Sequence, residues 1–450
     1  MRQFQKRIGF MISSQTMIPN GGIGQFTKSF VKLMSSYNIK VDIITDKQPP
    51  ASDFIEEIYA AGATMIYPEK PLPYTDHSAI YMFGDSYNYE RMANFRTALI
   101  MALENNLYDS IVCNTYESVQ VFLNTGLTDS IQMIAYTHLE SQIFKDTKNP
   151  FLHSVNEMMR QQLNLTGITI GTQSIFNRLQ FDDTVAQHLP IPLSEPDLLK
   201  EHNKPREGVL FIGRWEEGKN PELYLDLIQQ TGLPARVMTS PNGARKFEER
   251  LAKISTDYKI KHSIIGKEKV DFITDCRVAF NPSTVESYGM AFQEQMIQLP
   301  TVAIEDQRWL RNFDSRCYFT CNKKNMTTTV MDLYHKYPTA ESWYVAGALK
   351  HFQREEGEVF HKWNECFNDF TPRNSSVNTA AICKATTVKY RTYIEDLNRR
   401  IVCIDDIRSV LNNRHRFRVL YTEFDTWLTK DPMFVPVQEE VGLSLFEVIK

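Results

Sequence analysis

The sequence lacks the features of a membrane or secreted protein. No apolar run reaches the roughly 18 residues that a transmembrane helix needs. The N-terminus passes into a short strand-like segment, residues 8–12, without the pattern of a signal peptide. Cysteine is scarce, and the seven present are scattered and odd in number, which favours a reducing compartment over a disulfide framework. We therefore predict a cytoplasmic protein with no membrane partner.

Strong net charge and metal-binding motifs are lacking as well. The formal net charge of -4 argues against a general nucleic-acid coat, but it does not exclude a local basic face. Cys317 and Cys321 are the closest pair of cysteines and have no second CxxC or HxxxH partner, which argues against structural zinc. With 450 residues, 42% hydrophobic and 23% charged, the chain is typical of a globular protein of two or three domains.

A glycine loop lies near the start of the chain. Residues 8–12 predict a buried strand, which is followed by the loop and then by a helical pattern. The loop contains Gly21, Gly22 and Gly24, and a helix start at this point would present backbone N–H groups to a phosphate. The loop matches neither a Walker loop nor GxGxxG, so an ordinary turn is the alternative. A strand at 41–45 completes a predicted βαβ unit.

Two further apolar strands, at 110–114 and 132–136, each end at polar residues. In open parallel sheets, ligands collect at the carboxyl ends of the strands. His138 lies just past such an end and is therefore a candidate for chemistry, the alternative being a loop histidine at the sheet edge. A strand at 168–171 is predicted to be the last of an N-terminal domain that covers residues 1–190.

A proline-rich segment, 191–207, suits a stiff connection between domains, because proline fixes φ and removes a donor. A second α/β pattern follows over 208–330, and its first loop carries Arg214 and Lys219 ahead of a helix start at Pro221. A planar guanidinium fork beside a compact ammonium charge suits a diphosphate, the alternative being a solvated charged loop. Further strands are predicted at 235–238, 262–265, 278–280 and 301–304.

Two carboxylates flank the next predicted helix start. Glu286 lies in the loop after the strand at 278–280, Gly289 marks the start of the helix, and Glu294 lies about one and a half turns inside it. The exposed N–H groups of a helix start attract anions. One carboxylate before the start and one after it would therefore bracket a ligand that carries both hydroxyls and phosphate. The alternative is an ordinary strand-to-helix connection with two solvated glutamates.

The order of these residues resembles the donor domain of GT-B glycosyltransferases, especially the family-4-like retaining enzymes. Arg214 and Lys219 come first, and Glu286 and Glu294 then match that family's Glu-x7-Glu motif. The resemblance is good over about 205–305, moderate over 1–190 and absent beyond about 330. It implies an α/β fold with two Rossmann-like domains facing a cleft and transfer of a sugar from a nucleotide-diphosphate sugar with retention. The implied donor is a UDP-sugar, such as UDP-glucose or a UDP-pentose like UDP-arabinose.

The resemblance also implies a role for each matching position. Arg214 and Lys219 would hold the diphosphate and stabilise the leaving group, Glu286 would contact sugar hydroxyls, and Glu294 would bind the ribose hydroxyls. No bound metal is expected, since the chain has no Asp-x-Asp of the kind that holds one beside a diphosphate. The remaining implied contacts are His138 on the transferred sugar, Gly22 and Gly24 on the donor phosphates, and the backbone N–H groups of Gly289, Met290 and Ala291 on sugar and phosphate.

The last part of the chain, 331–450, is predicted to be a mostly helical extension. Residues 384–418 carry nine basic and four acidic side chains with interleaved aromatics, which indicates either the solvated face of a packed helical pair or a surface for a phosphate backbone. In the second interpretation, double-stranded DNA would be bound through Arg414, Arg416, Arg418 and their neighbours.

The composition, rich in Asn, Lys, Phe and Tyr, is similar to that of phage GT-B enzymes that glycosylate hydroxymethylcytosine in DNA. That resemblance implies flipping of the target base between the domains and action in the host cytoplasm. Two alternatives stay open: a glycosyltransferase for a polysaccharide, cell-wall or protein acceptor, and an inactive module that binds nucleotide or DNA.

Overall fold

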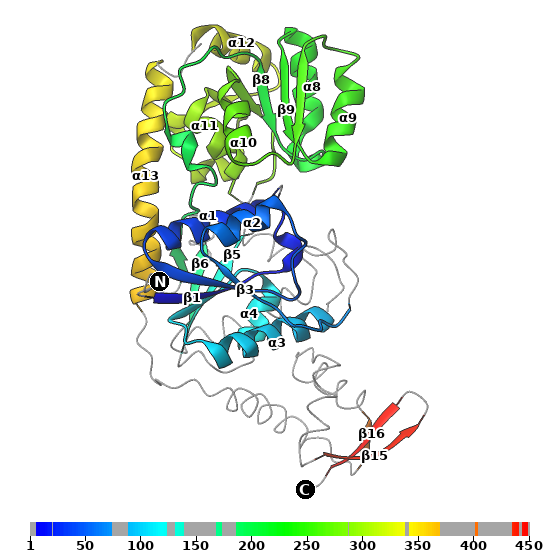
Figure 1. Cartoon of the computed structure of the whole chain (residues 1–450). Helices are drawn as coiled ribbons and strands as arrows, with labels where there is room; N and C mark the ends of the chain where they lie inside the picture. Colours follow the sequence, from blue (N-terminus) through cyan, green and yellow to red (C-terminus); the bar gives the residue numbers. More distant parts are fainter. Residues whose placement is uncertain are drawn as a thin grey trace.

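Two parallel β-sheets, each covered by helices, form the computed structural model of the chain (Figure 1). The structure describes residues 6–19, 21–73, 89–123, 131–138, 168–172, 186–286, 288–337, 342–369, 401–403, 434–440 and 443–448. The predicted α/β class with two Rossmann-like sheets is confirmed. The helix predicted near 174–179 and the basic tract at 384–418 lie outside the described residues, apart from 401–403 of the tract.

The first sheet has the strand order β3-β2-β1-β4-β5-β6-β7, and all its pairings are parallel. Its connections run outwards in both directions from the neighbouring strands β1 and β4, so the carboxyl ends of these two strands mark its ligand-binding edge. The strands are β1 (Lys6–Met11), β2 (Ile39–Ile44), β3 (Thr64–Ile66), β4 (Ser110–Cys113), β5 (Gln132–Thr137), β6 (Ile168–Thr172) and β7 (Ala186–His188).

Helices cover both faces of this sheet, which explains why its strands are apolar on both sides. Phe10 and Val112 pack with α1 and α2, whereas Met11 and Cys113 point to the opposite face and pack with α3 and α4. The helices are α1 (Gly22–Ser36), α2 (Asp53–Ala60), α3 (Tyr89–Asn105) and α4 (Tyr116–Leu123).

The second sheet has the order β10-β9-β8-β11-β12-β13 and is also parallel in every pairing. Its connections diverge at β8 and β11, which places the loops after these two strands side by side. The strands are β8 (Val209–Ile212), β9 (Ala235–Thr239), β10 (Tyr258–His262), β11 (Val278–Asn281), β12 (Thr301–Ile304) and β13 (Phe319–Cys321). The helices are α8 (Pro221–Thr231), α9 (Pro241–Leu251), α10 (Gly266–Thr274), α11 (Met290–Gln298) and α12 (Met326–Lys336).

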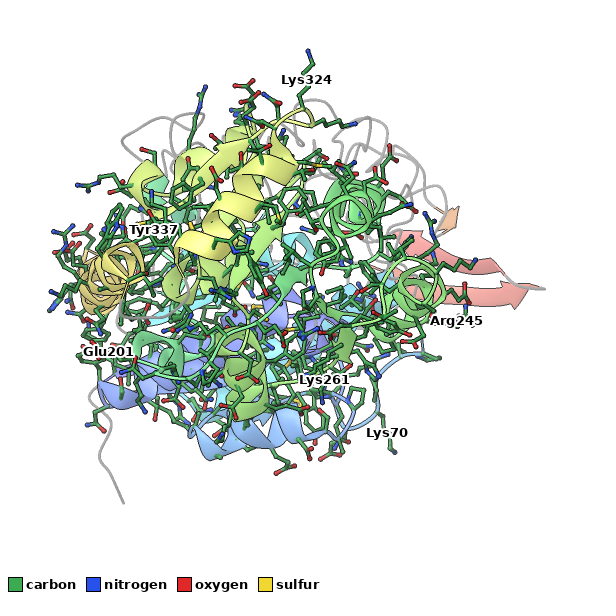
Figure 2. All side chains as sticks on the ribbon, turned by 90° about the horizontal axis from the view of Figure 1, so that it is seen from above. Lys70, Glu201, Arg245, Lys261, Lys324 and Tyr337 are labelled. Atoms are coloured by element: carbon green, nitrogen blue, oxygen red, sulfur yellow. The ribbon has the colours of Figure 1, made fainter. Side chains whose placement is uncertain are left out.

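Core packing divides these helices between the two faces. Phe211 on β8 packs with α8, α9 and α12, and its neighbour Leu210 packs with α10 and α11. Charged side chains on the outer surface point away from the sheet, as Arg245 of α9 and Lys324 show at the periphery of Figure 2.

Some predicted elements were misplaced. The strand at 168–171 was predicted to be the last of the first sheet, but β7 follows it. The strand predicted at 262–265 is wrong in position: β10 ends at His262, while Ile264 and Ile265 follow it and lead into α10. These two isoleucines are partly buried against the core, so their apolar character reports packing rather than strand structure.

The long helix α13 (Trp343–Asn368) runs past both sheets (Figure 1). Its first turn packs Tyr344 and Val345 into the core of the second sheet. Near its other end, the Trp363 ring packs against Phe26, Phe30 and Tyr136 of the first half. Trp363 is fully buried and donates its indole N–H to Pro190 O at 2.9 Å. Burying a large apolar side chain stabilises by roughly 1.5–3 kcal/mol, so α13 fastens the two sheets to each other.

The predicted helical character of the C-terminal part is confirmed for α12 and α13. The described residues near the C-terminus add a small antiparallel sheet that was not predicted, with β14 (Ile401–Cys403), β15 (Phe434–Glu440) and β16 (Leu443–Val448). Within the described part of the chain, no helix combines the length and the apolar character needed to cross a membrane.

Candidate functional site

An ion pair lies where the loops after β8 and β11 meet. Lys219 Nζ is 2.6 Å from Glu286 Oε1, and both side chains are mostly enclosed, at 17% and 13% exposure. Lys219 ends a short 3-10 helix, Glu217–Lys219, and Asn220 then adopts a left-handed φ of 49° before Pro221 begins α8. The structure therefore brings together two of the predicted catalytic residues.

The backbone fixes this meeting of loops. Gly218 O accepts hydrogen bonds from the backbone N–H groups of Thr284 at 2.9 Å and Val285 at 3.3 Å. A Cβ on Gly218 would lie 3.5 Å from Val285, so the two loops pack closely at this point. Arg214 differs from Lys219, because its side chain is exposed and, within the part of the chain that the structure describes, its ion pair is a local one with Glu216 at 3.1 Å. Its guanidinium lies in solvent, so it can move without breaking a buried contact.

Helix α11 starts at Met290, four residues after Glu286. Gly289 is its N-cap with a φ of +96°, and a Cβ at this position would lie 3.3 Å from the Trp309 ring. Glycine is therefore required both by the left-handed backbone and by the packed indole. Met290 and Ala291 form the first turn and are half-buried. The first N–H groups of a helix have no intrahelical partner and favour anions, so this start carries partial positive charge close to the ion pair.

Glu294 is buried inside α11, at 3% exposure, and contacts two residues that were not predicted. Lys269 Nζ on α10 lies 2.6 Å from Glu294 Oε1, and the Ser194 hydroxyl donates to the same oxygen. Lys269 Nζ also lies 3.3 Å from Ser194 Oγ, which closes a three-membered cluster. Within the described residues, no such contact is made to Oε2. The predicted ribose carboxylate is thus held from two sides.

The predicted glycines of the first sheet have different surroundings. Both lie in the first turn of α1, and Gly22 faces the second sheet: a Cβ on it would meet only Met290 Sδ, at 3.8 Å. The start of α1 therefore lies beside the start of α11. Gly24 faces its own loop, where a Cβ would lie 2.5 Å from Ile18 O and 2.8 Å from Thr16 O. Close packing within the loop accounts for glycine at position 24.

His138 lies just past β5 and is held by neighbouring groups. Its Nε2 bonds Asn114 Oδ1 at the end of the adjacent strand β4. Its ring meets Phe26 and Tyr136 edge-on, with ring centroids 5.2 Å and 4.9 Å apart. Burial raises the pKa of Tyr136 well above its ordinary value, so this phenol stays neutral.

The structure brings some of the predicted site residues together and does not describe others. Lys219, Glu286 and the start of α11 lie together, and Gly22 approaches this group across the two sheets. Arg414, Arg416 and Arg418 lie outside the described residues. Ser194, Lys269 and Asn114 were not predicted, because a serine in a proline-rich segment and a lone helical lysine carry no motif. Among the described residues, no group of three or more His, Cys, Asp or Glu side chains is arranged to hold a metal ion.

The fold is similar to several solved structures. Sucrose-phosphate synthase from Thermosynechococcus elongatus has a TM-score of 0.60 over 81% of this chain and 99% of its own, at 12% identity. HepE from Anabaena, in complex with UDP and glucose, has a TM-score of 0.54 over 79% and 100%, at 11% identity. WaaG, a glycosyltransferase involved in lipopolysaccharide biosynthesis, has a TM-score of 0.51 over 81% and 99%, at 10% identity.

These similarities establish the GT-B arrangement of two parallel α/β sheets. At such low identities they show the fold alone. No protein-family profile matches the sequence, and no curated protein matches it.

Proposed function

We propose that the protein is a glycosyltransferase that moves a sugar from a nucleotide-diphosphate sugar, with a UDP-sugar as the donor. The observation that carries this proposal is the Lys219–Glu286 pair beside the start of α11. An ammonium group and a helix N-terminus attract a diphosphate, and a carboxylate 2.6 Å from that ammonium suits the hydroxyls of the attached sugar. In this proposal residues 208–330 form the donor domain, 1–190 the acceptor-side domain, 191–207 their linker, and 331–450 an extension.

The diphosphate would compete with Glu286 for Lys219. On donor binding the ammonium turns to the phosphate oxygens, and Glu286 is released toward the sugar hydroxyls near the anomeric carbon. The exposed Arg214 moves in at little cost, since its present partner is a surface carboxylate. Two cations and the N–H groups of Met290 and Ala291 then stabilise the negative charge that develops on the leaving diphosphate.

The remaining predicted contacts complete the proposed donor site. Glu294 binds the ribose hydroxyls, His138 contacts the transferred sugar, and Gly22 lets the start of α1 approach the phosphates. Transfer with retention belongs to the proposal as well. Glucose and a pentose such as arabinose both offer the hydroxyls that Glu286 requires.

Hydroxymethylcytosine in duplex DNA is the acceptor that we propose. Its support is the excess of basic residues in 384–418, which includes Arg414, Arg416 and Arg418, in a chain that is acidic overall. Incubation of hydroxymethylated and unmodified duplexes with a mixture of UDP-sugars, followed by digestion and mass spectrometry, tests this acceptor. Added hexose or pentose mass on hydroxymethylcytosine is expected. Hydrolysis of a UDP-sugar with no mass added to hydroxymethylcytosine would overturn the DNA acceptor and keep the transferase.

Substitution of the ion pair tests the enzyme itself. Glu286→Gln and Lys219→Met are each expected to lower transfer, or slow hydrolysis of the UDP-sugar, by about 100-fold or more, as loss of a preorganised charged contact does. Glu222→Gln is the matched control, because Glu222 is an exposed carboxylate on α8 that pairs with Arg250 on the outer surface of α9. Circular dichroism checks the fold of each variant. Wild-type turnover in Glu286→Gln would remove the role assigned to this residue, and absence of turnover in the wild type with every donor would refute the enzyme.

A further inference from the structure

Two adjacent residues of the connecting segment contact opposite halves of the molecule. Ser194 and Glu195 are both buried, at 1% and 4% exposure. Ser194 contacts Glu294 and Lys269 on the second sheet's helices. Glu195 reaches α1 of the first sheet, where its Oε1 lies 3.0 Å from Lys28 Nζ. The segment therefore joins the proposed ribose carboxylate to α1 through two successive side chains.

Lys28 is fully enclosed and bonds on both sides. Its side chain is 0% exposed, and its Nζ lies 3.4 Å from Glu57 on α2 as well as 3.0 Å from Glu195. Glu195 Oε1 also accepts the backbone N–H of Gly266, the first residue of α10, at 3.1 Å. Two elements, α1 of the first half and α10 of the second, therefore converge on one buried carboxylate.

Such a buried charged cluster carries a desolvation cost that offsets its contribution to the stability of the fold. Desolvating an ammonium group and a carboxylate costs several kcal/mol each, and an apolar pair of similar volume is often at least as stable. Buried charges of this kind can instead fix one arrangement among several, because their partners must meet in a specific geometry. Here the arrangement fixed is that of α1 and the segment that bears Ser194, the residue that holds Glu294.

We propose that Lys28 is a positioning residue for recognition of the donor ribose, acting through Glu195 and Ser194 on Glu294. The inference rests on the proposed function, which assigns the ribose hydroxyls to Glu294. When Lys28 holds Glu195, the neighbouring Ser194 hydroxyl is aligned to donate to Glu294 Oε1, and Lys269 completes the hold on that oxygen. Oε2 is then presented to the ribose in one orientation.

Without Lys28, Glu195 keeps only the Gly266 N–H among these contacts and turns toward water. This movement displaces Ser194, and the carboxylate of Glu294 loses its fixed orientation. The site is thereby specific for ribonucleotide donors, and its discrimination against a 2′-deoxyribonucleotide depends on a lysine in the other half of the molecule.

The test compares binding of UDP and 2′-deoxy-UDP to the full chain by calorimetry, without any sugar transfer. We expect the wild type to bind UDP about 10-fold to 100-fold more tightly than 2′-deoxy-UDP. This affinity ratio corresponds to the loss of one hydrogen bond to a charged group. Lys28→Met and Ser194→Ala should each lower this ratio to about threefold or less, and Lys28→Arg should largely restore it. The double variant Lys28→Met with Glu195→Gln leaves no unpaired charge at the linker and guards against misfolding.

The matched control is Lys32→Met. Lys32 lies one helical turn from Lys28 on α1 and pairs with the same Glu57, at 3.2 Å, but it is more exposed and does not contact Glu195. In Lys32→Met, the ratio of UDP affinity to 2′-deoxy-UDP affinity should stay at the wild-type value. An unchanged ratio in folded Lys28→Met or in the double variant would overturn the inference and leave the donor site standing. A wild-type ratio near one would instead remove Glu294 from the ribose, and with it this part of the proposed function.

Discussion

Glu356 on α13 also holds the connecting segment, and it makes the stability of the protein depend on pH. Its carboxylate oxygens lie 3.2 Å and 3.1 Å from the backbone N–H of Leu193, the residue before Ser194. Burial raises the pKa of Glu356 to about 7, although the Leu193 N–H favours the charged form, and the neighbouring Glu355 raises it further. The folded protein therefore binds a proton that the unfolded chain has released.

The sign of the effect follows from this difference. A carboxyl group whose pKa lies near 4.5 when unfolded and about 7 when folded keeps its full contribution to stability below pH 4.5. The contribution is lost as the pH rises through 7, because the folded state must then bury a charge. One unit of difference in pKa corresponds to 1.36 kcal/mol, so the loss in the free energy of unfolding is at most about 3 kcal/mol. Glu356 keeps some contact with solvent, so we expect about 1–2 kcal/mol.

Glu356→Gln removes the charge and keeps an oxygen for Leu193. In urea unfolding, the variant should match the wild type near pH 5 and exceed its free energy of unfolding by about 1–2 kcal/mol at pH 8. Glu358→Gln serves as the control, since Glu358 is exposed on the same helix, and should track the wild type throughout. A difference between Glu356→Gln and the wild type that is constant from pH 5 to 8, or that reverses, would refute the reasoning.

The glycines at the helix starts provide further predictions. Gly24→Ala places a Cβ 2.5 Å from Ile18 O, and we expect a loss of about 1–3 kcal/mol in thermal or urea unfolding. Gly22→Ala has open space and should leave the free energy of unfolding within about 1 kcal/mol of wild type; an equal loss at both positions would contradict the packing account. Gly289→Ala combines a φ of +96° with a contact at 3.3 Å to Trp309, so we expect a loss of about 1–3 kcal/mol together with weaker UDP binding. If Gly289→Ala bound UDP as tightly as the wild type, the start of α11 would not be part of the donor site.

The fold could be predicted from the sequence because both sheets are buried on both faces. Strands such as β8, with the sequence VLFI, are then continuous apolar runs, and amphipathic helices separate the strands along the chain. The elements that were missed or displaced lie at the edges. β7 and β13 have three residues each, and β10 is an edge strand with exposed lysines, so their sequences carry little hydrophobic signal. Edge strands lack the pattern on which the prediction depends.

For the candidate site, the sequence predicted residues but not their partners. Lys219 and Glu286 were both assigned to the donor, yet nothing in a separation of 67 positions indicates a contact at 2.6 Å. That contact depends on the order of β8 and β11 in the sheet and on the carbonyl of Gly218. The assignment of Glu294 was made from the motif alone, and its burial against Lys269 depends on how α10 packs on α11.

The connecting segment was predicted as a stiff spacer, and its contacts make it part of the core. Leu193, Ser194 and Glu195 are buried, and one cluster of apolar side chains continues from the first sheet through this segment and α13 to the second. Rotation of one sheet against the other would have to break the Lys28–Glu195 contact and expose apolar surface, at roughly 25 cal/mol per Å². A single relative orientation is therefore favoured before any donor binds. That preference places Gly22 beside Met290 in advance, so a donor entering between the starts of α1 and α11 would find both already in position.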